Sequence, residues 1–220
     1  MKDDISPTTE KDNRGLNKTR LEAFCDGVFA IAITLLILEV KIPKHEDLIL
    51  CGGLKPYLAQ LWPDYFAYVF SFLVIGIWWS NHHYLSRLFT HTDHYFSMLT
   101  IGFLMSIAFL PFPTALLGDF ISDTEHRGTA ISFYIFGGLL LPSIFWNLMW
   151  RYGIFKKRLI DKRLKESFIK GLTRMYFISF IFITSVFALS FFFPIISFLI
   201  VIAVNLFFLK APKKPEYDNT

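Results

Sequence analysis

Residues 20–39 read RLEAFCDGVFAIAITLLILE, an apolar segment that also carries three acidic side chains, those of Glu22, Asp26 and Glu39. A bilayer with a hydrocarbon core of roughly 30 Å needs about 20 largely apolar residues in one helix. The range 20–42 meets that length, so we predict a membrane-spanning helix here. Acidic side chains inside a membrane are costly and rarely face lipid, so these carboxylates are expected to face protein.

The composition of the whole chain supports a membrane protein. Of its 220 residues, 54% are hydrophobic and 18% are charged, whereas soluble domains average about 45–50% and 25%. These values exclude a soluble globular domain and a disordered chain. Two cysteines are too few for a disulfide framework and no zinc-binding spacing is present, so we expect no metal or other cofactor. The sequence contains no nucleophile or nucleotide motif, so an enzyme is not predicted.

Uncharged stretches predict five further membrane spans. The long apolar range 175–209 would measure roughly 50 Å as one helix, and Pro194 is predicted to divide it into two spans. The others are expected at residues 65–86, between Asp93 and Asp119 with an end at Pro111-Phe112-Pro113, and between Arg127 and Arg151 with a kink at Gly137, Gly138 and Pro142. The predicted fold is therefore all-α, a polytopic membrane protein with six transmembrane helices.

The distribution of basic residues predicts the orientation. Six spans place both termini on one side of the bilayer, and most of the 22 Lys and Arg residues then lie on that side. Cytoplasmic loops near span ends are enriched in Lys and Arg, so we expect a cell-membrane protein with both termini in the cytoplasm. The predicted divisions are a tail at 1–18, a transmembrane domain at 19–210 and a tail at 211–220. The orientation of the chain in the membrane accounts for its excess of basic residues, so we expect no nucleic acid as a partner. The expected partner is the lipid bilayer.

Helical periodicity separates two faces of the first span. At about 100° per residue, Gly27, Ile31, Thr34 and Leu38 fall on one face, with Leu35 beside them. Asp26 points roughly 100° away from that face. The partner of this carboxylate should come from another helix, because Arg20 is neither three nor four residues away.

The second predicted span offers partners for Asp26 at a similar depth. Five polar or indole side chains lie four to nine residues before Arg87 on this antiparallel helix. Indole, amide and imidazole groups can donate hydrogen bonds to a carboxylate and offset its desolvation. Two interpretations stay open: a structural latch between two helices, and a proton relay in which Asp26 and a histidine titrate together. The candidates are Trp78, Trp79, Asn81, His82 and His83.

The motif Arg20-x-x-x-Phe24-Cys25-Asp26, followed by the apolar residues 27–35, resembles the first-helix signature of the transmembrane protein 175 (TMEM175) family of potassium channels. That signature usually reads R-x-x-x-F-S-D, so Cys25 replaces a serine, and a thiol is a weaker hydrogen-bond donor than a hydroxyl. The length of the chain resembles the single-copy prokaryotic form of the family.

The resemblance implies a homotetramer in which four first helices line a central pore. In this family Ile31 would form the hydrophobic constriction, Leu35 and Leu38 would form further rings, and Thr34 would present hydroxyls to the ion. Such channels lack the Thr-Val-Gly-Tyr-Gly filter loop of ordinary potassium channels, which is also missing from this sequence. The expected function is passive conduction of K⁺ in preference to Na⁺.

One alternative function stays open from the sequence alone. A proton-coupled or ion-coupled secondary transporter could use Asp26 with His82 or His83 as a relay. Transporters generally contain inverted repeats around a site at the membrane midplane, and we find no convincing internal repeat between residues 20–113 and 128–210.

Overall fold

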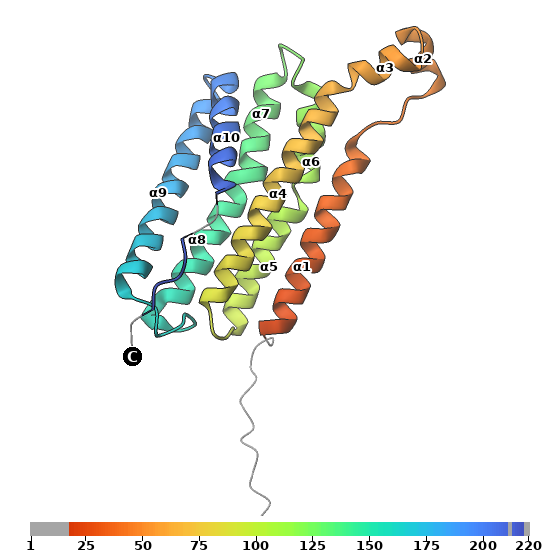
Figure 1. Ribbon diagram of the computed structural model, residues 1–220. Helices are drawn as coiled ribbons and strands as arrows, with labels where there is room; N and C mark the ends of the chain where they lie inside the picture. The colour runs from red at the N-terminus through yellow and green to blue at the C-terminus, as the bar shows by residue number, and fades with distance from the viewer. Residues whose placement is uncertain (1–17, 211–212, 218–220) are drawn as a thin grey trace, which may run out of the picture.

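A computed structural model describes residues 18–210 and 213–217, and within these ranges the chain is helical without any β-strand (Figure 1). The predicted tail at 1–18 therefore lies outside the described residues except for Lys18. Long helices lie side by side along one axis, as a membrane bundle requires. The predicted all-α fold is confirmed.

The first span consists of α1 (Lys18–Leu35) and a 3₁₀ segment (Leu36–Glu39). Two short helices, α2 (His45–Cys51) and α3 (Leu54–Gln60), follow and project from one end of the bundle (Figure 1). Gly52 and Gly53 connect them at φ values of 76° and 123°, in a region that L side chains rarely adopt. We call the end of the bundle from which α2 and α3 project the α2–α3 end. The opposite end, where α1 begins, is called the N-terminal end.

The next helix, α4 (Trp62–Leu88), is bent by 47° from α3. It leads to α5 (His94–Ala108) and α6 (Pro111–Phe120), which together form one 27-residue candidate span. The predicted end of this span at Pro111-Phe112-Pro113 was wrong. Pro111 is the first residue of α6, where the missing N–H would have no partner within the helix, so the span continues to Phe120.

A π-helix interrupts the following span. It comprises Phe136–Leu140 and connects α7 (Arg127–Ile135) to α8 (Leu141–Ile154), after which a 3₁₀ turn covers Phe155–Lys157. The break contains Gly137 and Gly138 and is followed by Pro142 in the first turn of α8. A Cβ atom on Gly137 would lie 3.0 Å from Cγ of Pro113, so a glycine allows the π-helix to pack closely against α6.

The last two helices are α9 (Glu166–Ser190) and α10 (Pro194–Phe208). The break before Pro194 confirms the predicted division of this range. With 15 residues, α10 is about 22 Å long and shorter than a bilayer core of roughly 30 Å. Among the described residues, four segments are long and apolar enough to cross a membrane, and the bent pair of α3 and α4 forms a fifth. The count of six spans therefore stays a prediction.

Candidate functional site: the first helix and its contacts

One face of α1 packs against the rest of the protomer. Its buried residues recur every three or four positions, as expected for a helix with one packed face, and they contact α4 and α5. Phe29 is 3% exposed and its ring lies 6.1 Å from that of Phe103. The buried face consists of Leu21, Cys25, Phe29, Ala32 and Leu36.

The predicted pore face is the opposite face, and it is uncovered in the protomer. Ile31 is 61% exposed, Leu35 41% and Leu38 72%, and Thr34 is also exposed. Leu38 lies in the 3₁₀ segment, where residues three apart align along the axis, so Leu35 and Leu38 share a face. The structure thus places all four predicted pore residues on one exposed stripe, which we call the α1 stripe (Ile31, Thr34, Leu35 and Leu38).

The hydroxyl of Thr34 bonds to its own helix. Its Oγ1 lies 3.0 Å from the carbonyl oxygen of Ala30 and 2.9 Å from that of Ile31. One hydroxyl hydrogen serves one of these acceptors at a time. Because donation to the backbone uses none of the oxygen's acceptor capacity, the Oγ1 lone pairs stay available on the exposed stripe.

Asp26 accepts a hydrogen bond from α4. The indole Nε1 of Trp79 donates to Oδ1 of Asp26 at 2.9 Å. The ring of His83 stacks on Trp79 with centroids 6.1 Å apart, and Nε2 of His83 lies 2.9 Å from Nη2 of Arg87. A row of polar and aromatic side chains therefore runs from Asp26 along α4 toward the N-terminal end.

The other predicted partners of Asp26 contact different groups. Trp78 donates to the carbonyl oxygen of Gly138 in the π-helix at 3.1 Å, and Asn81 donates to that of Ile77 at 2.8 Å. His82 is 8% exposed, and its ring packs against Phe29 and Phe103 with centroids 5.9 and 5.6 Å away. Of the five candidates, Trp79 is the one that hydrogen bonds with Asp26.

The remaining signature residues differ in their exposure. Arg20 is exposed, Phe24 is 50% exposed, and Cys25 is 1% exposed. Cys25 and His82 line the same small cavity beside α5. Across residues 18–210 and 213–217, His, Cys, Asp and Glu side chains form no group of three or more that could hold a metal ion.

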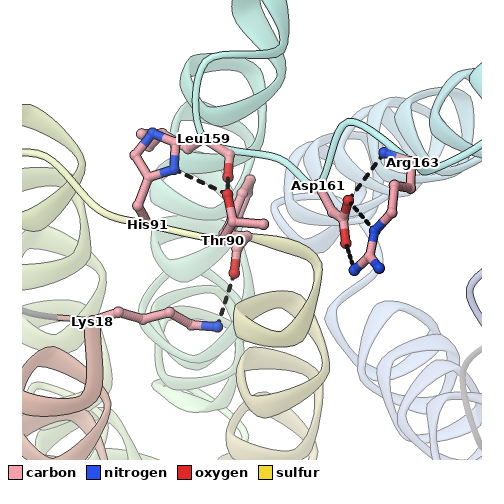
Figure 2. A network of polar contacts seen from close by, with 7 residues as sticks. Lys18, Thr90, His91, Leu159, Asp161 and Arg163 are labelled. Atoms are coloured by element: carbon pink, nitrogen blue, oxygen red, sulfur yellow. Dashed lines mark hydrogen bonds and ion pairs between the residues drawn. The ribbon is translucent and has the colours of Figure 1, made fainter.

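A network at the N-terminal end was missed by sequence reasoning (Figure 2). Lys18 Nζ donates to the carbonyl oxygen of Phe89 at 2.8 Å, which connects the start of α1 to the α4–α5 loop. The backbone N–H and Oγ1 of Thr90 both donate to the carbonyl oxygen of Leu159, at 2.9 and 3.2 Å. The network therefore joins three segments that are far apart in the sequence. A lysine beside a loop carbonyl has no sequence signature that could have predicted it.

The α8–α9 loop is held by a second set of contacts. Asp161 accepts hydrogen bonds from the guanidinium of Arg163 at 2.8 and 3.1 Å, and these bonds lower the pKa of the Asp161 carboxyl (Figure 2). The backbone N–H of Asp161 donates to the carbonyl oxygen of Leu88 at 2.9 Å. Electrostatics and backbone pairing thus fix this loop against the end of α4.

The C-terminal segment also packs on this end of the bundle. Tyr84 donates its hydroxyl to the carbonyl oxygen of Lys213 at 2.7 Å, and the N–H of Lys165 donates to that of Glu216 at 3.0 Å. Arg163 lies over the ring of Tyr217, 5.7 Å from its centroid. Residues 213–217, which the sequence predicts as part of a tail, are therefore in contact with α4 and the α8–α9 loop.

The long apolar helices and the uncovered apolar stripe on α1 define a polytopic α-helical membrane protein. The chain belongs to the TMEM175 family. The family model described as "Endosomal/lysosomal potassium channel TMEM175" matches residues 20–111. This range holds the signature, the α1 stripe and the Asp26–Trp79 contact, and the predicted family is confirmed.

Two relatives and one solved structure show the extent of the similarity. A potassium channel of Chamaesiphon minutus is 39% identical over 158 residues, which cover 71% of this chain and 76% of that protein. A potassium channel of a Chryseobacterium species is 31% identical over 201 residues, covering 91% and 97%. The crystal structure of a lysosomal potassium-selective channel TMEM175 homolog from Chamaesiphon minutus superimposes with a TM-score of 0.76 at 34% identity, covering 87% of this chain and 96% of that one.

Proposed function

We propose that this protein is a potassium channel of the cell membrane that conducts passively and prefers K⁺ to Na⁺. The observation that carries the proposal is the α1 stripe, three aliphatic side chains and one threonine left uncovered on a helix whose opposite face is packed. Family membership supports it, since relatives that match most of this chain are named potassium channels.

The pore of the proposed channel forms between four copies of the chain. Four α1 stripes facing a common axis would cover apolar surface that a single protomer leaves exposed. Rings of Ile31, Leu35 and Leu38 would create narrow apolar necks, which gate by losing water. In this arrangement the chain has six spans, with α10 as the sixth, and both termini in the cytoplasm.

Selectivity in this proposal arises from dehydration. An ion that enters an apolar neck loses part of its hydration shell, and K⁺ is hydrated less tightly than Na⁺. Thr34 oxygens, whose lone pairs are not used by the helix bond, would replace some of the lost water. A neck with so few ligands should discriminate less than a filter built from carbonyl rings.

The geometry around Asp26 favours a latch over a proton relay. Asp26 bonds to the indole of Trp79, a group that only donates hydrogen bonds and does not ionise at ordinary pH. His82 packs between phenylalanine rings, and His83 contacts Arg87. Neither histidine is hydrogen bonded to Asp26, so the contacts do not favour the alternative of a proton-coupled transporter.

Ion flux into liposomes tests the proposal. The full-length protein is reconstituted and K⁺ efflux is followed with and without a proton gradient, with Na⁺ replacing K⁺ in a parallel series and protein-free vesicles as control. We expect K⁺ flux well above Na⁺ flux and independent of the proton gradient. Flux that requires a proton gradient, or equal flux of both ions, would contradict a potassium-selective channel.

A further inference from the structure

A cavity lies inside the bundle on the side away from the α1 stripe. It is lined by α4, the π-helix, α8, α9 and α10, is partly open to the outside, and has a volume of about 70 Å³. One water molecule needs roughly 10–15 Å³ of such space, so the cavity can hold a molecule larger than water. No residue of α1 contributes to its wall, and the cavity is therefore separate from the proposed pore.

Three amide side chains from three helices line the cavity. Asn81 belongs to α4, Asn147 to α8 and Asn205 to α10. In each, Nδ2 donates to the carbonyl oxygen four residues earlier in its own helix, at 2.8, 2.9 and 2.9 Å. Such a bond uses one of the two N–H donors of an amide and none of the acceptor capacity of its oxygen. Each amide thus retains both a donor and an acceptor for another partner.

Asn205 is buried, so the hydrogen-bond donor and acceptor that its amide leaves unused affect how favourable it is for a molecule to occupy the cavity. Asn205 is 8% exposed and sits on an otherwise strongly apolar helix. Buried polar groups are usually satisfied by protein, water or ligand, because leaving them without a partner costs free energy. The cavity is therefore a place where a hydrogen-bonding molecule is favoured over an empty space.

Aromatic rings form another part of the wall. The ring of Trp146 lies 5.7 Å from that of Trp78 and 5.6 Å from that of Tyr176, the second pair in an edge-to-face arrangement. Aromatic surfaces pack well against flat or polarisable groups. None of the residues that line the cavity carries a charge, and a charged ligand would find no counter-ion there.

The cavity occurs where α10 stops. Phe208, the last residue of α10, lines it, and Figure 1 shows α10 ending well short of the ends of α4 and α9. Leu209, Lys210 and residues 213–217 are not helical, and Lys213 is held by Tyr84 of α4. Helix α10 therefore covers the cavity only as far as Phe208, its last residue.

From these observations we propose that the cavity is a binding site for a small uncharged molecule of about four or five non-hydrogen atoms, with a short apolar part and one hydroxyl or amide group. The apolar part would lie against Trp78, Trp146 and Tyr176, and the polar group would bond to Asn205 or a neighbouring amide. The site adjoins the contact between helices, because Trp78 lines the cavity while the next residue, Trp79, bonds to Asp26 of α1.

Quenching of tryptophan fluorescence tests the site directly. The full-length protein in detergent is titrated with 2-bromoethanol, whose bromine quenches indole fluorescence on contact, and with 1-bromopropane, which has the same shape without the hydroxyl. We expect saturable quenching by the alcohol. Ser179→Phe and Val204→Phe, which fill the cavity from two different helices, should abolish the saturable part. Ser185→Phe, on the exposed side of α9, is the matched control and should leave it unchanged.

The class of ligand is tested by a separate variant. Asn205→Leu keeps the side-chain volume but removes the amide, and it should weaken binding of the alcohol about three- to tenfold and that of 1-bromopropane less than about twofold. Quenching that rises linearly without saturation, or that persists in both cavity-filling variants, would show that water alone occupies the cavity. Equal effects of Asn205→Leu on the two probes would overturn the hydrogen-bonding part of the proposal. None of these readouts depends on ion conduction.

Discussion

The indole of Trp79 donates a hydrogen bond to the carboxylate of Asp26 at 2.9 Å and thereby connects α1 to α4. Asp26 lies on neither the buried face of α1 nor the α1 stripe. The bond therefore adds a polar contact beside the packed face of α1, whose burial against α4 and α5 also sets the direction in which Ile31 and Thr34 point. This contact is the one expected if Asp26 acts as a latch between the two helices.

Removing this bond should loosen α1. Trp79→Phe and Asp26→Ala are each expected to lower the thermal stability of the protein in detergent, because a hydrogen bond to a charged group contributes about 1 kcal/mol or more. The double variant should be less destabilised than the sum of the single variants. Trp62→Phe, at the far end of the same helix, serves as the control. Strictly additive effects at Asp26 and Trp79 would show that the two side chains do not interact.

Widening the proposed neck should increase conductance. Ile31→Ala and Leu35→Ala each remove a bulky side chain from the α1 stripe, so the neck should hold water more readily and single-channel current should rise severalfold. Ile181→Ala is the matched control, since Ile181 is 50% exposed but belongs to α9. Currents that stay unchanged at both stripe positions, or that increase equally at Ile181, would show that these residues do not line the pore.

The Thr34 hydroxyl should contribute to ion preference. Thr34→Val keeps the shape of the side chain and removes its oxygen, so the permeability ratio of K⁺ to Na⁺, measured from reversal potentials, should fall. Thr34→Ser retains the oxygen and should preserve more of the ratio. If Thr34→Val and Thr34→Ser behave alike, the hydroxyl is not a ligand for the ion.

The Asp161–Arg163 pair predicts a small dependence of stability on pH. The folded-state pKa of the Asp161 carboxyl is lowered by its bonds to Arg163, so its stabilising effect is present above the usual Asp pKa and is lost as the pH falls through the lowered value. Arg163→Gln should lower Tm by about one degree at pH 6. The difference from the wild type should shrink as the pH falls below the usual Asp pKa and through the lowered value, and a difference that stays constant over this range would assign the effect to packing on Tyr217.

Much of α1 could be predicted from the sequence, because helical periodicity depends only on spacing. The stripe of Ile31, Thr34, Leu35 and Leu38 is exposed as that spacing requires. The choice of Trp79 among five candidates could not be predicted, since it depends on the rotation of α4, which is set by contacts such as the bond from Trp78 to Gly138. Those contacts involve residues 60 positions apart.

Other features depended on local chemistry that a residue type does not determine. Pro111 and Pro194 are each the first residue of a helix, where proline is tolerated. Leu110, before Pro111, keeps helical φ and ψ values of −60° and −32°, so the span of α5 and α6 continues. Phe193, before Pro194, has values of −133° and 67°, which separates α9 from α10. The contact of Lys18 with Phe89 and that of Tyr84 with Lys213 use backbone carbonyls as acceptors. Every residue has such a carbonyl, and the sequence therefore contains no signal for these contacts.

Accessibility of single cysteines tests the central claim, that the exposed stripe of α1 lines the ion path. Leu38→Cys and Ile181→Cys are made in a Cys51→Ser background, with Cys25 left in place because it is buried, and K⁺ current is recorded before and after a cationic methanethiosulfonate reagent. Ile181 is 50% exposed and belongs to α9, so it is the control position. We predict that the reagent blocks most of the current through Leu38→Cys and leaves that through Ile181→Cys unchanged. Block at Ile181→Cys with none at Leu38→Cys would place the ion path on another face of the protein.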